Sequence, residues 1–321
     1  MLNLPTMTDV TQAAERLAPY SHRTPVLTSR AVNARSDAEV FWKCENFQKV
    51  GAFKFRGACN TVFSLSAEEA ARGVITHSSG NHAAAVALAA RLRGIRAFVV
   101  MPENAPAVKK AAVAGYGAEI TFCESTPQAR ETTCARIVED TGATFIHPSN
   151  DPRVIAGQGT AALELCEEVA NLDIVMAPVG GGGLLSGTAI AVSGVSPNTA
   201  VIAAEPLNAD DAYRSLQTGT IIPSGNPQTI ADGLRTSLGD VTFPLIQRHV
   251  QAILTVTEDA IIEAMRYLWE RMKIVIEPSA AVPAAALFAY PDKFAQRRVG
   301  IILSGGNVDL SRLPFSPHAP A

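Results

Sequence analysis

The sequence predicts an α/β protein made of two doubly wound units whose sheets are mostly parallel. Short apolar runs without polar alternation recur along the chain, as is typical of strands buried on both faces. A longer segment with helical periodicity follows nearly every run, which is the order found in parallel sheets covered by helices. The length of 321 residues is sufficient for two such units, each with its own core.

The predicted elements begin with a helix over residues 9–20, followed by an extended segment from Thr24-Pro25. We expect strands at 39–44, 74–77, 97–101, 119–122, 144–147, 174–178, 200–205, 253–256 and 299–304. We expect helices at 53–65, 81–93, 106–115, 126–140, 154–169, 184–193, 209–217 and 258–272. The segments 223–227 and 314–321 are rich in proline and are expected to be irregular.

The most regular alternation of strands and helices runs from residue 73 to residue 148. This range predicts a small α/β domain inserted into a larger one, which comprises residues 1–72 and 149–321. Ligands of open parallel sheets bind beyond the carboxyl ends of the strands. Polar segments that directly follow strands are therefore the candidate site.

The composition argues against several classes of partner. Charged residues make up 18% of the chain and the formal net charge is −3, so we expect neither a nucleic-acid partner nor a polybasic membrane surface. No apolar run approaches the roughly 18 residues of a membrane span, and the first residues do not resemble a signal peptide. The five cysteines are dispersed, which is typical of reduced thiols and favours a cytoplasmic location.

Lys54 is the first candidate catalytic residue. It lies between Phe53 and Phe55, shortly after Gly51 and at the start of a predicted helix. Apolar neighbours disfavour the charged ammonium and lower its pKa, which makes a lysine able to form a Schiff base. The alternative is a helix lysine whose amine extends into water.

The glycine run at residues 180–183 is the clearest binding motif. Gly180, Gly181, Gly182 and Gly183 follow a predicted strand, and Leu184 opens the next helix. Such a segment lets backbone N–H groups converge on an anion at a helix N-terminus, and phosphate is the natural guest. It is neither a dinucleotide fingerprint nor a Walker loop. The alternative is a flexible turn.

Two further polar segments follow predicted strands. Ser78, Ser79, Gly80, Asn81 and His82 form a turn whose N–H groups and hydroxyls suit a carboxylate. An ordinary helix N-cap is the alternative for this turn, since serine and asparagine are preferred there.

Ser304 begins Ser-Gly-Gly-Asn after the last predicted strand. Its hydroxyl suits a hydrogen bond to a ring nitrogen, and a simple turn is the alternative.

Together, the Lys54 segment, the Ser78–His82 turn, the glycine run and the Ser304 segment resemble the threonine/serine dehydratase and serine racemase family. The resemblance extends from about Thr24 to Leu310 with the segments in the same order. It implies pyridoxal-phosphate fold type II, the tryptophan synthase β-like fold, and a homodimer that acts on a small amino acid.

The resemblance also implies a role for each segment. Lys54 would carry the cofactor as a Schiff base, Phe53 would pack on its ring, and the Ser78–His82 turn would bind the substrate carboxylate. The remaining cofactor contacts would come from Asn81 at the ring hydroxyl, Ser304 at the pyridine nitrogen, and Gly180, Gly181, Gly182, Gly183 and Leu184 at the phosphate. The implied activity is that of an ammonia-lyase, in which Lys54 takes the Cα proton, the β-hydroxyl leaves, and a keto acid and ammonia result.

Three residues narrow the choice of substrate, through their resemblance to residues of family members. Ser79 matches a serine that faces the lysine across the cofactor in racemases. Arg130 matches a racemase arginine near the substrate side chain, where it would pair with a second carboxylate; a solvated helix arginine is the alternative. The segment with Ala52, where mammalian racemases have serine, resembles that of the 3-hydroxyaspartate dehydratases. We therefore expect conversion of L-threo-3-hydroxyaspartate to oxaloacetate, with serine racemase activity or general L-serine/L-threonine dehydration as alternatives.

A divalent cation is also implied by the resemblance. Glu205, the carbonyl of Ala209, and Asp211 match the cation site of the racemase branch, where oxygen ligands suit Mg²⁺ (or Ca²⁺ or Mn²⁺). The alternative is an acidic helix N-terminus that is stabilised by the helix dipole.

Overall fold

The strands form two separate sheets in the computed structural model, which describes residues 3–105 and 107–315. The larger sheet has the order β1-β2-β10-β7-β8-β9 and the smaller one β5-β4-β3-β6. The strands are β1 Val26–Leu27, β2 Glu39–Cys44, β3 Val74–His77, β4 Ala97–Pro102, β5 Glu119–Cys123, β6 Thr144–Phe145, β7 Ile174–Pro178, β8 Ala200–Pro206, β9 Ala252–Val256 and β10 Arg298–Leu303. All pairings are parallel except that of β1 with β2, which confirms the predicted fold class.

The helices cover both faces of each sheet. They are α1 Met7–Leu17, α2 Arg30–Ser36, α3 Lys54–Ser64, α4 Ala67–Arg72, α5 Asn81–Arg93, α6 Ala107–Gly115, α7 Pro127–Thr141, α8 Pro152–Glu168, α9 Gly183–Val195, α10 Asp211–Thr218, α11 Thr242–His249, α12 Glu258–Met272, α13 Pro278–Ala289 and α14 Pro291–Phe294. Residue 106, where one predicted helix was to start, and residues 316–321 of the predicted irregular tail lie outside the described residues.

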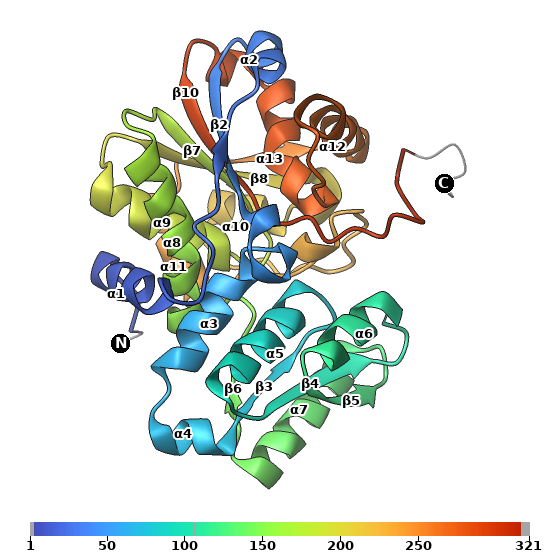
Figure 1. Cartoon of the computed structure of the whole chain (residues 1–321). Helices are drawn as coiled ribbons and strands as arrows, with labels where there is room; N and C mark the ends of the chain where they lie inside the picture. The colour runs from blue at the N-terminus through green and yellow to red at the C-terminus, as the bar shows by residue number, and fades with distance from the viewer. Residues whose placement is uncertain (1–2, 106, 316–321) are drawn as a thin grey trace.

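The large sheet is buried between two helical layers (Figure 1). α8 and α9 pack on one face, while α13 crosses the other face and is itself covered by α12. β10 lies in the middle of this sheet, where Ile301 is paired with Trp42 of β2 and Met176 of β7. Strands that are apolar on both faces, as the sequence predicted, are what this arrangement requires.

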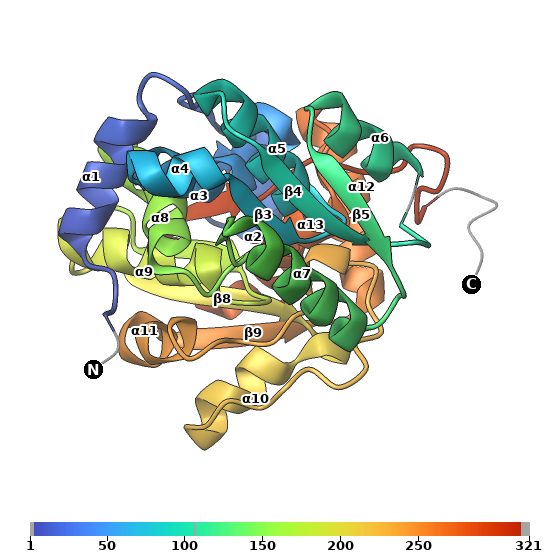
Figure 2. The ribbon, with the colours of Figure 1, turned by 90° about the horizontal axis from the view of Figure 1, so that it is seen from below.

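The small sheet is covered in the same way (Figure 2). Val99 of β4 packs toward α5 and α6, whereas the next residue, Val100, packs toward α7. The four strands lie between residues 74 and 145, inside the range 73–148. The division into an inserted and a large domain at these bounds remains our proposal.

The sequence analysis missed several helices, and the largest of them is α13. This helix is apolar around its whole circumference and contains Pro283, so it showed neither a polar face nor an uninterrupted helical pattern. It is nevertheless fully packed, with residues 279–287 buried between the large sheet and α12. A helix that is apolar on all sides is a buried helix, and its missing polar face is the reason it was not recognised. The other missed helices are α2, α4, α11 and α14.

Some predicted bounds were wrong for local reasons. The helix predicted at 9–20 begins at Met7, because the Thr6 N–H and hydroxyl both donate to Asp9 at 2.7 Å, and it ends at Leu17. The strand predicted at 144–147 ends at Phe145. Beyond it the chain turns, and the His147 ring accepts hydrogen bonds from the backbone of the following residues.

Helix α3 links the two sheets, because it packs against α5 on one side and α8 on the other (Figure 1). A buried ion network fixes its first turn. The Arg56 guanidinium is fully buried and forms two hydrogen bonds to the carboxylate of Glu45, at 2.7 and 2.8 Å, and two to that of Glu164, at 2.7 and 2.8 Å. Lys54 lies two residues before this anchor.

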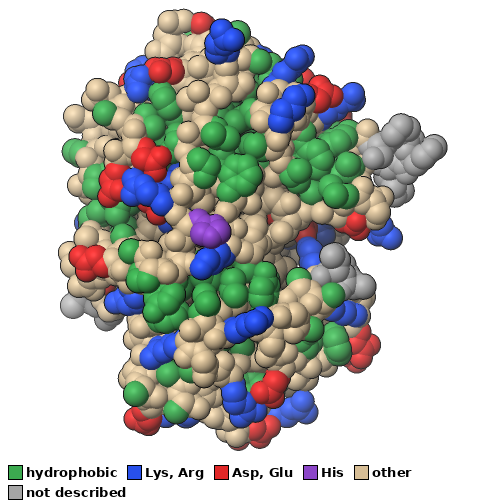
Figure 3. Space-filling model, in the orientation of Figure 1, with side chains coloured by type: hydrophobic (Ala, Val, Ile, Leu, Met, Phe, Trp, Pro, Cys, Tyr) green, Lys and Arg blue, Asp and Glu red, His purple; other side chains and the backbone are tan. Residues whose placement is uncertain are grey.

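The surface seen in Figure 3 carries Lys and Arg side chains interspersed with Asp and Glu side chains and with hydrophobic ones. No helix within residues 3–105 and 107–315 is both long and apolar enough to cross a membrane.

Candidate active site

Lys54 lies at the first residue of α3, with its amine enclosed by protein. Part of the side chain remains accessible, but Nζ donates a 2.7 Å hydrogen bond to the carbonyl of Pro148 and lies 5.1 Å from the centre of the Phe53 ring. Burial lowers the pKa of Lys54 to about 8, and the charge of Glu277 opposes this shift. The neutral amine that a Schiff base requires is therefore accessible near neutral pH, as the sequence predicted.

The pKa of Lys54 leads to a pH prediction for reconstitution of the cofactor-free protein with pyridoxal phosphate. Only the neutral amine attacks the aldehyde, so the rate is expected to rise with pH, to be half-maximal near pH 8, and to level off above it. Stopped-flow absorbance between pH 6 and 10 checks this. Glu277→Gln should move the curve to lower pH, since it removes a charge that favours the ammonium. A rate that still rises steeply above pH 9 would show that the pKa of Lys54 is that of an ordinary lysine.

The glycine loop lies between β7 and α9 and is packed too closely for side chains. A Cβ on Gly181 would lie 2.4 Å from Oγ of Ser149, and one on Gly180 would lie 2.8 Å from Cα of Leu234. Gly182 has φ of +82°, which side chains disfavour. The four glycines are thus required by the local structure, which is inconsistent with a merely flexible turn.

The glycine loop has the donors that a phosphate requires. It opens into the N-terminus of α9, whose first N–H groups have no partner within the helix. The hydroxyls of Ser149 and Thr236, which sequence reasoning missed, lie against the loop. The Leu184 side chain is buried in the core, so only its backbone N–H is available to an anion. These residues fit the phosphate of the cofactor that the resemblance implies.

Ser304 lies directly after β10 and against the Lys54 segment. Its carbonyl accepts a 3.0 Å hydrogen bond from the Phe53 N–H, and Gly305 forms an antiparallel bridge with Ala52. Ser304 itself is buried. The structure therefore brings together the Ser304 and Lys54 segments, which are 250 residues apart by their numbering.

Asn81 is held between the two parts of the site by groups that sequence reasoning missed. Its amide nitrogen donates to both carboxylate oxygens of Glu277 at 3.1 Å, and its amide oxygen accepts from Asn307 at 2.9 Å. Glu277 is buried, and burial raises its pKa to about 7. An isolated acid before an apolar helix gave no sequence signal for this contact.

The Ser78–His82 turn connects β3 to α5, as predicted. Ser78, Ser79 and Gly80 are half-buried, and the Gly80 N–H donates to the Ser78 hydroxyl at 3.3 Å. The His82 ring is not placed to bind a ligand, because it is buried and its Nε2 is 3.1 Å from the carbonyl of Ile146. His82 can therefore contribute its backbone N–H to an anion, but not its ring.

Arg130 lies on α7 and acts electrostatically on the end of β3. Burial lowers the pKa of His77, and the charge of Arg130 lowers it further. The arginine is half-buried. Its guanidinium therefore lies near His77, the residue that precedes the Ser78–His82 turn.

Of the three predicted cation ligands, Glu205 is the penultimate residue of β8, whereas Ala209 and Asp211 follow the strand. The carboxylate of Glu205 accepts from the N–H groups of Ala212 and Tyr213 at 3.0 and 2.8 Å, so it caps α10. Because of this cap, α10 begins at Asp211, not at the predicted residue 209. Among the described residues, no three His, Cys, Asp or Glu side chains gather as a metal centre.

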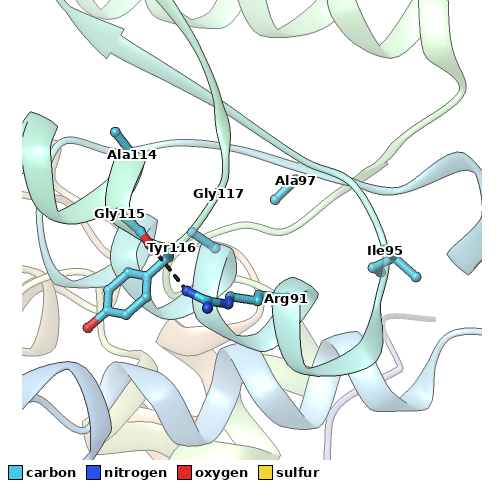
Figure 4. A pocket seen from close by; sticks show the side chains of 8 residues that line it. Arg91, Ile95, Ala97, Ala114, Gly115, Tyr116 and Gly117 are labelled. Atoms are coloured by element: carbon cyan, nitrogen blue, oxygen red, sulfur yellow. Dashed lines mark hydrogen bonds between the residues drawn. The ribbon is translucent and has the colours of Figure 1, made fainter.

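A cavity of about 330 Å³ lies elsewhere, between α5, β4 and the end of α6 (Figure 4). Arg91 donates to the carbonyl of Gly115 at 3.3 Å across it, and Tyr116 lines it. None of the predicted site residues lines this cavity.

The chain is similar to known proteins over nearly its whole length. Residues 17–305 match the family model described as pyridoxal-phosphate dependent enzyme. A beta-hydroxyaspartate dehydratase of Paracoccus denitrificans is 52% identical over 98% of this chain and 99% of its own. The L-threo-3-hydroxyaspartate ammonia-lyase of Saccharomyces cerevisiae is 47% identical over 96% and 95%. The crystal structure of serine racemase from Dictyostelium discoideum superposes with a TM-score of 0.92 at 51% identity, covering 95% of this chain and 99% of that one.

These similarities agree with the site described above, in which a buried lysine of lowered pKa lies near a glycine loop suited to phosphate. The chain is therefore an enzyme of the pyridoxal-phosphate dependent family with fold type II, and its relatives include ammonia-lyases and serine racemases.

Proposed function

We propose that this enzyme is an ammonia-lyase that converts L-threo-3-hydroxyaspartate to oxaloacetate and ammonia. The observation that carries the choice of substrate is the position of Arg130, whose charge acts on His77 at the edge of the Ser78–His82 turn. A guanidinium pairs with a carboxylate in two parallel hydrogen bonds, and a hydroxymethyl or hydroxyethyl side chain has no group to match it. Relatives that bear hydroxyaspartate names, at 52% and 47% identity, support the same choice.

Bound pyridoxal phosphate supplies an electron sink for the pair of electrons left on Cα when its proton is removed. The protein supplies the remaining parts. Lys54 holds the cofactor and, once its amine is released, takes the proton from Cα. The glycine loop and the N-terminus of α9 hold the phosphate. The Ser78–His82 turn holds the α-carboxylate with its N–H groups and hydroxyls, which orients the Cα–H bond toward Nζ. Loss of the β-hydroxyl as water and hydrolysis of the product enamine give the keto acid and ammonia.

Serine racemase activity is the second candidate, and Ser79 is the residue that favours it. A hydroxyl on the cofactor face opposite Lys54 is able to return a proton from that side, which inverts Cα. Ser79 is half-buried in the turn between β3 and α5, where it remains accessible to a ligand. The balance of the two reactions is read directly from D-serine formed beside pyruvate.

Replacing Arg130 by alanine tests the preferred substrate. We expect kcat/KM for L-threo-3-hydroxyaspartate to fall by about 10- to 100-fold, because hydrogen bonds to a charged group are lost, while the value for L-serine changes little. Arg136, which is exposed on the same helix α7, is the matched control, and Arg136→Ala should leave both values unchanged. An equal loss for both substrates in the Arg130 variant would contradict the assignment.

We further propose that Glu205, the carbonyl of Ala209 and Asp211 bind a divalent cation of the Mg²⁺ type. Asp211 is buried, and its carboxylate oxygens form no hydrogen bond of normal geometry among the described residues, although Ser224 lies close enough to lower its pKa. Burial raises the pKa of Asp211 to about 6 and that of Glu205 to about 9. Two buried acids, of which Glu205 already accepts two backbone N–H groups, fit a cation, which returns both to the charged form. The cation would be structural, since none of its ligands belongs to the Lys54 site.

Addition of millimolar Mg²⁺ is expected to raise the melting temperature of the enzyme, and chelation should reverse the increase. The increase should disappear in Asp211→Asn. Asp210→Asn is the control, because Asp210 pairs with Arg214 at 2.7 Å and has no place in the proposed ligand set. If Asp211→Asn responds to Mg²⁺ as the wild type does, the site is wrong.

A further inference from the structure

Three rings form a cluster at the ends of β3 and β6. His77 is stacked on Phe145, with ring centres 5.2 Å apart and 29° between the planes. The His147 ring is edge-on to both, at 6.5 Å from His77 and 6.1 Å from Phe145. All three residues are half-buried. We call this set the ring cluster; the function described so far gives it no role.

The ring cluster lies beside the reacting amine, and the charge of Arg130 acts on it. On one side, the Lys54 amine donates to the carbonyl of Pro148, the residue after His147, and its charge helps to lower the pKa of His147. On the other side, the charge of Arg130 helps to lower the pKa of His77. The two histidines therefore connect the position where chemistry occurs with the guanidinium proposed to bind a second carboxylate.

The hydrogen bonds of His147 fix which of its nitrogens carries the proton. Nδ1 accepts from the backbone N–H groups of Ser149 and Asn150, at 3.1 and 2.7 Å, so Nδ1 is unprotonated and Nε2 carries the hydrogen. Burial, together with the charges of His77 and Lys54, lowers the pKa of His147 to about 4, although Asp151 and Asp240 oppose the shift. His147 is thus a neutral donor at pH 7, with a fixed tautomer.

Neutral histidines are suited to recognition, not to proton transfer in this reaction. A general acid for a leaving hydroxyl works best when its pKa is near the working pH. With a pKa of about 4, His147 would be charged in only about one molecule in a thousand at pH 7. The pKa of His77 is likewise lowered by burial and by Arg130, although a hydrogen bond of its ring to its own backbone and the charge of Glu131 oppose the shift. An N–H donor beside a guanidinium instead fits a carboxylate.

The other hydrogen-bond donors of the site are already assigned to two anions, the cofactor phosphate and the α-carboxylate of the substrate. The glycine loop fits the phosphate, and the Ser78–His82 turn fits the α-carboxylate. The donors of His77, His147 and Arg130 are additional to both. We propose that His77 and His147 are specificity-determining residues that, with Arg130, bind a carboxylate carried on Cβ of the substrate. This inference rests on the proposed function and names further residues that would select its dicarboxylic substrate.

Equilibrium binding of L-aspartate and L-alanine to the holoenzyme tests this inference without turnover. Neither amino acid has a β-hydroxyl to lose, and they differ by the β-carboxylate. Binding is followed by the change in cofactor absorbance. His77→Phe keeps the stacked ring and removes the N–H. His147→Asn keeps an acceptor for the Ser149 and Asn150 N–H groups and removes the imidazole, so that no N–H remains at the position of Nε2. Each variant is expected to weaken the binding of L-aspartate by about 10- to 100-fold and to change the binding of L-alanine by less than about threefold.

His249→Phe is the matched control, since His249 is a half-buried histidine on α11 that contacts Ser193 at 3.1 Å. It should bind both ligands as the wild type does. If the wild type prefers L-aspartate and both ring-cluster variants keep that preference, the ring cluster has no recognition role while the proposed function stands. If the variants weaken the binding of both ligands equally, the inference is overturned as well. If the wild type does not prefer L-aspartate, the dicarboxylate assignment itself fails, and the inference with it.

Discussion

Lys54→Ala is expected to lower keto-acid release by about 10⁴-fold or more and to abolish the visible absorbance of the lysine-bound cofactor. The reason is that one amine serves two roles in the proposed reaction. It attaches the cofactor, and it takes the Cα proton once it is released. The amine is enclosed by protein and its pKa of about 8 keeps a reactive neutral fraction at neutral pH.

Lys49→Ala is the control for Lys54→Ala. Lys49 lies in the same segment, and its amine is 5.5 Å from the centre of the Phe55 ring. This variant should keep its absorbance. Phosphate binding by the glycine loop does not depend on Lys54, so the Lys54 variant should still bind pyridoxal phosphate reversibly, with weaker affinity. A Lys54→Ala protein that retains turnover would contradict the assignment of the catalytic amine.

Arg56→Met is expected to lower the free energy of unfolding by about 3–5 kcal/mol. Arg56 is the cation between two carboxylates, and the side chains of both Arg56 and Glu45 are fully buried. Removing the guanidinium leaves the Glu45 carboxylate buried with only the Thr24 hydroxyl, at 2.6 Å, as a remaining side-chain donor. An unpaired buried charge costs several times more than a lost surface pair.

Urea denaturation of Arg56→Met measures this loss. Arg266→Met is its matched control, because Arg266 forms an exposed pair with Glu270 four residues further along α12, and it should change stability by less than about 0.5 kcal/mol. The double variant Arg56→Met with Glu45→Gln should recover part of the loss, since it also removes the buried negative charge. A loss in Arg56→Met no larger than in Arg266→Met would show that the network contributes little.

The strands were predicted well because buried parallel strands are solid apolar runs, and these are visible in a sequence. The helices that were missed lacked a contrast between faces. α13 has no polar face and contains Pro283, so its packing against the large sheet decides its structure instead of a local pattern. α4 did have a local signal, because Ser66 and Glu69 form a capping box at its start. Helix α4 could therefore have been predicted from its capping box.

Most of the site residues that the sequence predicted follow strands or open helices, where polar groups interrupt apolar runs, whereas Glu205 lies inside β8. Glu277 was missed because it is a single acid, and only the fold shows that it meets Asn81 and Asn307. The ring cluster was missed for a similar reason. His77 and His147 are 70 residues apart by their numbering and become neighbours only because β3 pairs with β6. Arg56 gave no signal of its role either, and only the structure shows that it is the centre of an ion network.

The most direct test is keto-acid release from L-threo-3-hydroxyaspartate, L-serine and L-threonine with Mg²⁺, assayed beside D-serine formation. We predict oxaloacetate formation with a kcat/KM well above that for pyruvate formation, and loss of this preference in Arg130→Ala. Serine turnover dominated by D-serine, with no preference for the dicarboxylate, would contradict the proposed function and would assign a racemase instead.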